Sequence, residues 1–126
     1  MIIAEAGVNH NGDIGIARKL VEVAASSGAD YVKFQTFKTE KLVTAYAPKA
    51  AYQEIRIGIE GSQFGMLKKL ELDEQAHVLL MDHAREHGIR MISTPFDEGS
   101  AELLNRLNVD LFKVGSGDLT NTLLLR

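Results

Sequence analysis

Short apolar runs alternate along the chain with stretches in which apolar residues recur every three to four positions. The short runs predict strands at residues 2–6, 31–35, 89–93 and 111–114. The periodic stretches predict amphipathic helices at residues 14–27, 74–87 and 100–107, a short helical piece at 63–70, and a further helix that begins near Thr120. Helices of ten or more residues separate most of these strands, so the strands are expected to run parallel.

Residues that start and stop helices stand at the expected places in this pattern. Asp13 and Asp73 precede two of the predicted helices as N-caps, and Gly28 and Gly88 follow them as stop residues. A stop residue also precedes a polar strand residue by five positions in three units: Gly28 to Lys33, Gly88 to Ser93, and Asn108 to Lys113. This weak repeat predicts equivalent positions for the three polar residues on neighbouring strands.

Two architectures fit four parallel βα units: a doubly wound sheet, or half of a (β/α)₈ barrel. A whole barrel needs about 250 residues. The chain has 126 and ends inside a unit, so residues 1–126 are interpreted as the truncated first half of a TIM barrel, with about four βα units. Unpaired strand edges are expected to make such a half barrel dimerise or aggregate when isolated.

Composition excludes several classes of protein. The net charge is −3, from 14 Lys+Arg and 17 Asp+Glu, which argues against a broad nucleic-acid surface. No apolar run approaches the ~18 residues of a membrane span, and the opening MIIAE does not resemble a secretory signal. The chain has no cysteine and therefore no disulfide or thiolate site. A cytoplasmic location is expected.

The segment at residues 36–72 is long and irregular, with Pro48 and three glycines. Loops of this length inside a compact domain are usually functional.

Polar residues gather where the predicted strands end. In both parallel architectures, ligands bind beyond the carboxyl ends of the strands. The residues at these ends are Glu5, Gly7 and Asn9; Lys33, Gln35 and Thr36; Ser93, Thr94 and Phe96; and Lys113, Ser116 and Asp118. Lys33 and Lys113 have apolar neighbours, and a lysine is costly to bury without an anion.

These features together predict an anion pocket. Two lysines, nearby hydroxyls and the turn at residues 115–117 (GSG) would bind a phosphate or carboxylate, helped by the N-terminus of the helix near Thr120. The alternative is that each lysine points outward or pairs with a carboxylate such as Glu5. Glu5 itself could be a general base, a ligand of metal or water, or the salt-bridge partner of Lys33.

The histidines do not form an evident metal site in the sequence. His10 is interpreted as a residue that stabilises a turn. His83 and His87 have the i,i+4 spacing that suits zinc, but they and His77 are interpreted as surface residues. The turn at residues 115–117 is by itself a weak signal, and the sequence contains neither a GxGxxG fingerprint nor a Walker loop.

Taken together, the strand-end motifs resemble the sialic acid synthase family (N-acetylneuraminate synthase-like). They are AEAGVNHNG at 4–12, VKFQTF at 32–37, STPFD at 93–97 and FKVGSG at 112–117, with further similarity at 46–53 and 69–72. The resemblance implies a (β/α)₈ barrel followed by an antifreeze-like domain, of which this chain holds the first half of the barrel. It implies condensation of phosphoenolpyruvate with N-acetylmannosamine or a related hexosamine, giving a nonulosonic acid and phosphate.

The resemblance also implies roles for particular residues. Lys33, Thr94, Lys113 and Ser116 would hold the phosphate and carboxylate of phosphoenolpyruvate, and Glu5 would be catalytic, near the attacking water and the metal. Gln35 and Phe96 would line the pocket, and Asp118 would contact the sugar, where the family often has a glutamate that is longer by one methylene. The required Mn²⁺ or Mg²⁺ would be held by histidines from the second half of the barrel, so no metal ligand is assigned here. A homodimer is expected for the full-length protein.

Two other functions remain open at this point. A strand-end lysine in a barrel can be the nucleophile of a Schiff-base aldolase. A module that only binds a phosphorylated ligand is the second alternative, and it describes the isolated 126 residues, which are expected to be inactive.

Overall fold

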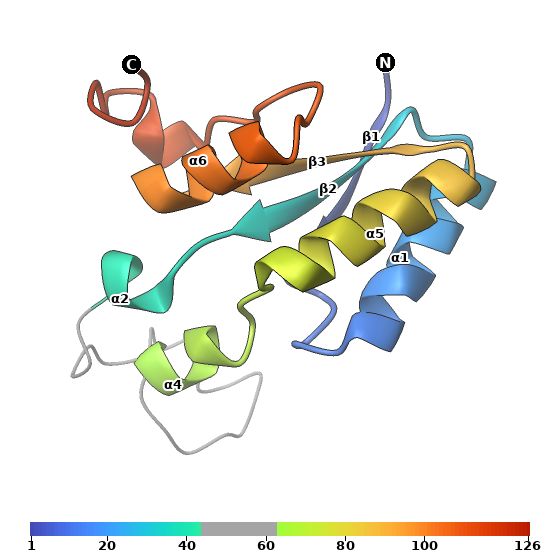
Figure 1. Cartoon of the computed structure of the whole chain (residues 1–126), viewed down its shortest axis with the longest axis horizontal. Coiled ribbons are helices and arrows are strands. Elements are labelled where there is room, and N and C mark those ends of the chain that lie inside the picture. The colour runs from blue at the N-terminus through green and yellow to red at the C-terminus, as the bar shows by residue number, and fades with distance from the viewer. Residues whose placement is uncertain (44–62) are drawn as a thin grey trace.

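Three parallel strands form one sheet in the computed structural model, which describes residues 1–43 and 63–126 (Figure 1). The strands are β1 (Ile3–Gly7), β2 (Tyr31–Thr36) and β3 (Arg90–Pro95), in the spatial order β1-β2-β3. Helices α1 (Ile14–Ser26) and α5 (Glu74–Glu86) lie side by side on one face of this sheet, and α6 (Glu98–Arg106) packs beside β3. The parallel α/β arrangement expected from the sequence is confirmed.

The three long helices begin where an aspartate caps them. Asp13 accepts a hydrogen bond from the Ile16 amide at 3.0 Å, and Asp73 accepts one from the Ala76 amide at 2.8 Å. Both predicted caps are confirmed. α6 begins two residues earlier than predicted, because Asp97 caps it through the Ser100 amide at 2.9 Å.

The predicted stop residues also end these helices. Gly28, Gly88 and Asn108 have φ angles of 77°, 71° and 56° respectively. In each case the next amide donates back to a helix carbonyl five positions earlier, as from Ala29 to Ala24. This is the Schellman arrangement, which turns the chain out of the helix and into the following segment.

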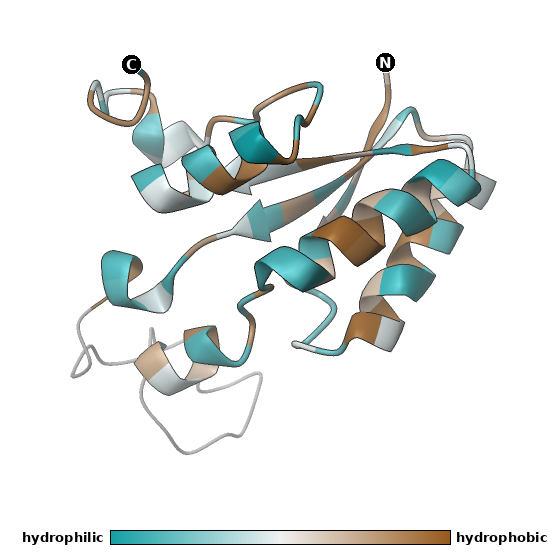
Figure 2. Ribbon diagram, in the orientation of Figure 1, coloured by the Kyte–Doolittle hydropathy of each residue, from teal (hydrophilic) through white to brown (hydrophobic). Residues whose placement is uncertain are grey.

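The core lies between the sheet and the helix pair α1–α5. Its fully buried members include Ala17, Val21, Val32, Phe34 and Leu80. Figure 2 shows hydrophobic and hydrophilic positions interleaved along α1 and α5, as the amphipathic pattern predicts. Alternation along the strands therefore turns Val32 and Phe34 towards the helices, and turns Lys33 and Gln35 to the opposite face.

The predicted fourth strand is reduced to a single parallel bridge between Ser93 and Phe112. Phe112 is 45% exposed, and in the described ranges no further strand pairs with it. The expectation of a full strand at 111–114 was wrong, because an edge segment without burial on its faces gains little from extending the ladder.

The helix predicted from Thr120 is also absent. A 3₁₀ turn, η1 (Ser116–Asp118), is followed by hydrogen-bonded turns up to Leu125. Leu119, Leu123 and Leu125 are 66%, 71% and 46% exposed. Short helices are marginal without a buried apolar face, and this segment buries none.

The register of the sheet corrects the inference drawn from the weak repeat. Phe34, and not Lys33, pairs with Ser93, and Ser93 in turn bridges to Phe112, not to Lys113. Ser93 therefore faces the helices, while Lys33 faces away from them. The three polar residues of the repeat are not equivalent.

Two short helices border the long irregular segment, α2 (Thr39–Leu42) and α4 (Gln63–Lys68), and the second confirms the short helical piece. The amide of Thr39 donates to the Glu71 carboxylate at 2.7 Å, and Lys68 contacts Glu71 at 3.2 Å. The motif at 46–53 lies outside the described residues. In the described part of the chain, no helix is both long and apolar enough to cross a bilayer.

Candidate functional site at the carboxyl ends of the strands

Lys33 is the centre of a polar group on the face of the sheet opposite α1 and α5. Its side chain is 9% exposed, and its Nζ contacts Glu5 Oε2 at 2.8 Å and Thr94 Oγ1 at 3.3 Å. Glu5 and Lys33 are register partners on parallel strands, so their side chains leave the sheet on the same face. Thr94 lies on that face too, opposite Gln35. The structure therefore brings together three of the predicted site residues.

Gly7 places Gln35 and Glu5 close to each other at the end of β1. The strand has an irregularity between Glu5 and Gly7, and Gly7 has a φ of 54°. A Cβ on Gly7 would lie 3.0 Å from Glu5 Oε1 and 3.6 Å from Gln35 Nε2. A side chain at this position would be strained and would crowd the carboxylate, so glycine is what lets Glu5 occupy this position.

The segment after β3 brings further predicted residues to the same edge. A Cβ on Gly115 would lie 3.4 Å from Asp118 Oδ2, 3.6 Å from the ring of Phe96 and 3.9 Å from Thr94 Cγ2. The Asp118 amide donates to the Gly115 carbonyl at 3.0 Å, which closes the 3₁₀ turn that begins with Ser116. Thr94 thus links the Lys33 group to the turn that carries Asp118.

The backbone of Lys113 lies at the carboxyl ends of the strands, but its side chain does not contact Lys33. Its amide donates to the Ser93 carbonyl at 3.3 Å, which sets it next to Thr94 on the neighbouring strand. Its side chain is exposed, and its Nζ donates to the Val114 carbonyl at 3.0 Å. Lys33 thus forms the ion pair with Glu5 that the sequence left open as an alternative to the anion pocket, and Lys113 is exposed.

A buried series of hydrogen bonds lies on the helix-covered face of the sheet, behind the site. His77 donates from Nδ1 to the Asp73 carbonyl at 2.8 Å, so its Nε2 accepts from the Thr36 hydroxyl at 2.8 Å. Thr36 in turn accepts from the Ser93 hydroxyl at 2.7 Å. These hydrogen bonds connect α5 to the carboxyl ends of β2 and β3.

The interpretation of His77 and His83 as surface residues was wrong. They are 0% and 5% exposed. Burial lowers the pKa of His77 below its ordinary value, because the imidazolium would lose its hydration. The four-residue separation of His77 from Asp73 in the sequence could have indicated the hydrogen bond between them. It could not show that Thr36 and Ser93 face the helix.

His10 stabilises a turn, as predicted. The Gly12 amide donates to His10 Nδ1 at 3.0 Å, and the ring is fully buried near Phe34. Burial, and then the proximity of His77, lower the pKa of His10. Gly12 has a φ of 78°, and a Cβ there would clash with the Lys69 carbonyl oxygen, so the turn packs directly on the segment before α5.

Comparison with known proteins identifies the family. The model of the NeuB family matches residues 20–126. N,N'-diacetyllegionaminic acid synthase of Campylobacter jejuni is 52% identical over 121 residues, which cover 96% of this chain and 36% of that protein. N-acetylneuraminate-9-phosphate synthase of Mus musculus is 37% identical over 127 residues, covering 95% of this chain and 33% of the relative. The chain belongs to the NeuB family, as its strand-end motifs indicated.

Solved structures agree with this assignment. N-acetylneuraminic acid (sialic acid) synthetase of Leptospira borgpetersenii, in complex with citrate, superposes with a TM-score of 0.79 at 30% identity, covering 98% of this chain and 39% of that one. The spore coat polysaccharide biosynthesis protein SpsE of Bacillus subtilis gives a TM-score of 0.70 at 34% identity, covering 99% and 32%. The chain spans about a third of the length of the curated relatives that it matches.

Proposed function

We propose that the full-length protein condenses phosphoenolpyruvate with N-acetylmannosamine or a related hexosamine, releasing phosphate and a nonulosonic acid. The observation that carries the proposal is Lys33, buried at a strand end with Thr94 beside it and Glu5 in front of it. Synthases of legionaminic, N-acetylneuraminic 9-phosphate and pseudaminic acids among the relatives support the product class. In this proposal, residues 1–126 are the first half of a (β/α)₈ barrel, and the face of the sheet that carries Lys33 is part of its interior.

The anionic groups of phosphoenolpyruvate would bind between the ends of β2, β3 and the segment after β3. An ammonium has three N–H donors, and within residues 1–43 and 63–126 Glu5 and Thr94 account for two of those on Lys33. The exposed side chain of Lys113 can turn from the Val114 carbonyl to a bound anion, with the Ser116 hydroxyl as a further donor. Charge-assisted hydrogen bonds of this kind are roughly twice as strong as neutral ones.

Glu5 would change its role when the substrate binds. A phosphate or carboxylate arriving at Lys33 replaces Glu5 as the partner of the ammonium, and this exchange frees the Glu5 carboxylate to take a proton from the attacking water. That water adds to the carbon bearing the phosphate ester while the methylene carbon of the enol attacks the aldehyde carbon of the sugar, and the aldehyde oxygen takes up a proton to become a hydroxyl. The tetrahedral intermediate would then expel phosphate, whose charge Lys33 and Lys113 would stabilise.

The remaining predicted residues would shape the pocket. Gln35 and Glu5 both lie near Gly7, and Phe96 and Asp118 both lie near Gly115. Phe96 would cover the substrate, and Asp118 would accept hydrogen bonds from the sugar hydroxyls. A binding site that fixes both substrates in this way gains most of its rate from orientation.

The residues at the carboxyl ends of the strands supply only part of the ligand set that a divalent metal needs. Glu5 offers a carboxylate oxygen, which Mn²⁺ and Mg²⁺ accept, but one such ligand leaves most of their coordination sphere to residues beyond this chain. When bound, the ion would supply Lewis-acid polarisation of the sugar carbonyl.

The contacts of Lys33 favour this reaction over Schiff-base aldol chemistry. A Schiff-base lysine reacts as the neutral amine, usually in an apolar or cationic environment. Lys33 instead lies 2.8 Å from a carboxylate, which is the environment of an ammonium.

The test is release of inorganic phosphate by the full-length protein with phosphoenolpyruvate, Mn²⁺ and a panel of N-acetylated hexosamines. We expect phosphate release that requires both substrates, one equivalent for each nonulosonic acid formed. Borohydride trapping with pyruvate is the matched test for the aldolase. A covalent adduct on Lys33, or an absence of turnover with every hexosamine, would contradict the proposal.

A further inference from the structure

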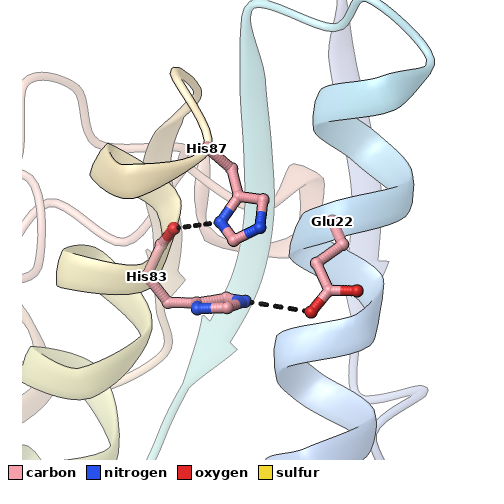
Figure 3. A group of neighbouring side chains, drawn as sticks. All are labelled: Glu22, His83 and His87. Carbon is pink, nitrogen blue, oxygen red and sulfur yellow. Dashed lines mark hydrogen bonds and ion pairs between the residues drawn. The ribbon is translucent and has the colours of Figure 1, made fainter.

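Glu22, His83 and His87 form a compact cluster between α1 and α5, separate from the group of strand-end residues. Figure 3 shows the two imidazole rings extending from α5 towards the carboxylate on α1. One candidate ligand atom from each of the three residues lies within 4.8 Å of the other two. The cluster lies between the helices on the helix-covered side of the sheet, whereas Lys33 points to the other side.

The spacing on α5 explains why the histidines meet. His83 and His87 are separated by one helical turn, so their rings lie one above the other, with centroids 4.3 Å apart. Glu22 approaches from the neighbouring helix, with Oε1 at 3.3 Å from His83 Nε2. Two imidazoles and a carboxylate that converge from two helices are a typical donor set for zinc.

Hydrogen bonds already select the coordinating nitrogen of His87. Its Nδ1 donates to the His83 carbonyl at 2.9 Å, because a carbonyl can only accept. The neutral ring therefore carries its lone pair on Nε2. A metal-binding histidine is usually fixed in this way, by a backbone carbonyl or carboxylate on the other nitrogen.

His83 supplies a second observation that points to a ligand. The ring is 5% exposed, and its Nε2 makes no well-aligned hydrogen bond in the described ranges, although it lies 3.3 Å from Glu22 Oε1 in an ion pair. Buried polar atoms without a partner are uncommon and costly. A cation between His83 Nε2 and Glu22 Oε1 would satisfy both atoms.

Three charged side chains next to the cluster determine how a metal ion can bind there. Arg18 Nη2 lies 3.3 Å from His83 Nδ1, and Lys19 contacts the other oxygen of Glu22 at 2.8 Å. Coordination through Nε2 places the proton of His83 on Nδ1, so Arg18 has to move away. Glu86 Oε2, at 3.8 Å from His83 Nδ1, is then the acceptor for that proton. Lys19 can stay, because it uses the oxygen that faces away from the histidines.

We propose that Glu22, His83 and His87 bind a divalent transition-metal ion of the Zn²⁺ class, which clamps α1 to α5. Two nitrogen donors favour Zn²⁺, Co²⁺ or Ni²⁺ over Mg²⁺. The three residues leave a fourth tetrahedral position for water. The ion would tie the two helices together, and this role is independent of the proposed synthase reaction.

The experiment measures Zn²⁺ binding to the purified metal-free protein by calorimetry, and Co²⁺ binding by its visible d–d absorption. His87→Gln and Glu22→Gln each remove one ligand, and neither residue is buried. Asp82→Asn is the matched control, since Asp82 lies on the exposed side of α5 and pairs with Arg85. Far-UV circular dichroism without metal checks that every variant is folded.

We expect a Zn²⁺ site, distinct from that of the catalytic metal in the proposed function, that raises the melting temperature and gives a Co²⁺ spectrum of tetrahedral intensity. His87→Gln and Glu22→Gln should each weaken binding at least about tenfold, the loss that changes outside the ligand shell already cause. Asp82→Asn should bind like the unmodified protein. Unchanged affinity in either ligand variant, or no binding at millimolar Zn²⁺, would overturn the proposal.

Discussion

At the scale of single residues, Lys33 combines burial with charge. Its stem lies on a strand between Val32 and Phe34, which are both fully buried. Its ammonium is compensated by Glu5, whose side chain is 56% exposed. A buried cation that depends on an exposed anion can exchange that anion for another, and this property makes the pair suitable for binding an anionic substrate.

Glu5→Gln tests this exchange. The amide keeps the shape of the side chain but neither balances the charge of Lys33 nor accepts a proton from water. We therefore expect the kcat of the full-length protein to fall by a factor of about 10² or more, the usual contribution of a general base. The KM for phosphoenolpyruvate should stay the same or decrease, because the competing carboxylate is gone.

Steady-state kinetics of phosphate release separate the two constants, with Glu102→Gln, a change of an exposed residue on α6, as the control. A large increase in KM with an unchanged kcat would show that Glu5 only positions the substrate.

At the scale of elements, sequence reasoning was most accurate where a local rule decides the structure. The caps Asp13 and Asp73 and the stop residues Gly28, Gly88 and Asn108 all have the predicted roles, because capping depends on neighbours within a few residues. The fourth strand and the final helix were predicted from equally regular patterns. They do not form, since both depend on burial that the described part of the chain does not provide.

His77 links α5 to β2 and β3, and its burial predicts that the free energy of unfolding depends on pH. The pKa of His77 is lowered in the folded state, whereas an unfolded chain has a histidine pKa near 6.5. Above about pH 6.5, the ring is neutral in both states. Below it, the unfolded chain binds a proton that the folded chain excludes, so the free energy of unfolding falls with decreasing pH until the folded-state pKa is reached.

Urea unfolding at pH 7.5 and pH 5.5, in buffer with a chelator, measures this effect. We expect a lower midpoint at pH 5.5, and a smaller difference between the two pH values in His77→Gln, which loses the titrating ring. His87→Gln on the same helix is the control, since that ring is exposed. His10, whose pKa is also lowered, should account for part of the remaining dependence. An identical pH dependence in His77→Gln and the unmodified protein would contradict this account.

At the scale of the whole molecule, the chain is a NeuB-family α/β unit whose predicted site residues lie along one edge of the sheet. Lys33 contacts both Glu5 and Thr94. Gln35 lies with Glu5 near Gly7, and Phe96 and Asp118 lie with Thr94 near Gly115. The rule that ligands bind at the carboxyl ends of parallel strands was enough to select this edge. It could not place Lys113, because the orientation of an exposed side chain depends on neighbours and ligands more than on the pattern of its own strand.

The central claim is that Lys33 and Lys113 together bind the anionic groups of phosphoenolpyruvate. The most direct measurement is the KM for phosphoenolpyruvate in Lys33→Met and Lys113→Met of the full-length protein. Methionine keeps the length of the stem, and the Glu5 left behind remains hydrated. Lys19→Met, which removes an exposed lysine on α1, is the matched control.

We predict that each strand-end variant raises this KM about 10- to 100-fold, as expected for the loss of a hydrogen bond to a charged group worth about 1.5–3 kcal/mol. The KM of Lys19→Met should be unchanged. Near-normal saturation by phosphoenolpyruvate in both Lys33→Met and Lys113→Met would contradict the claim.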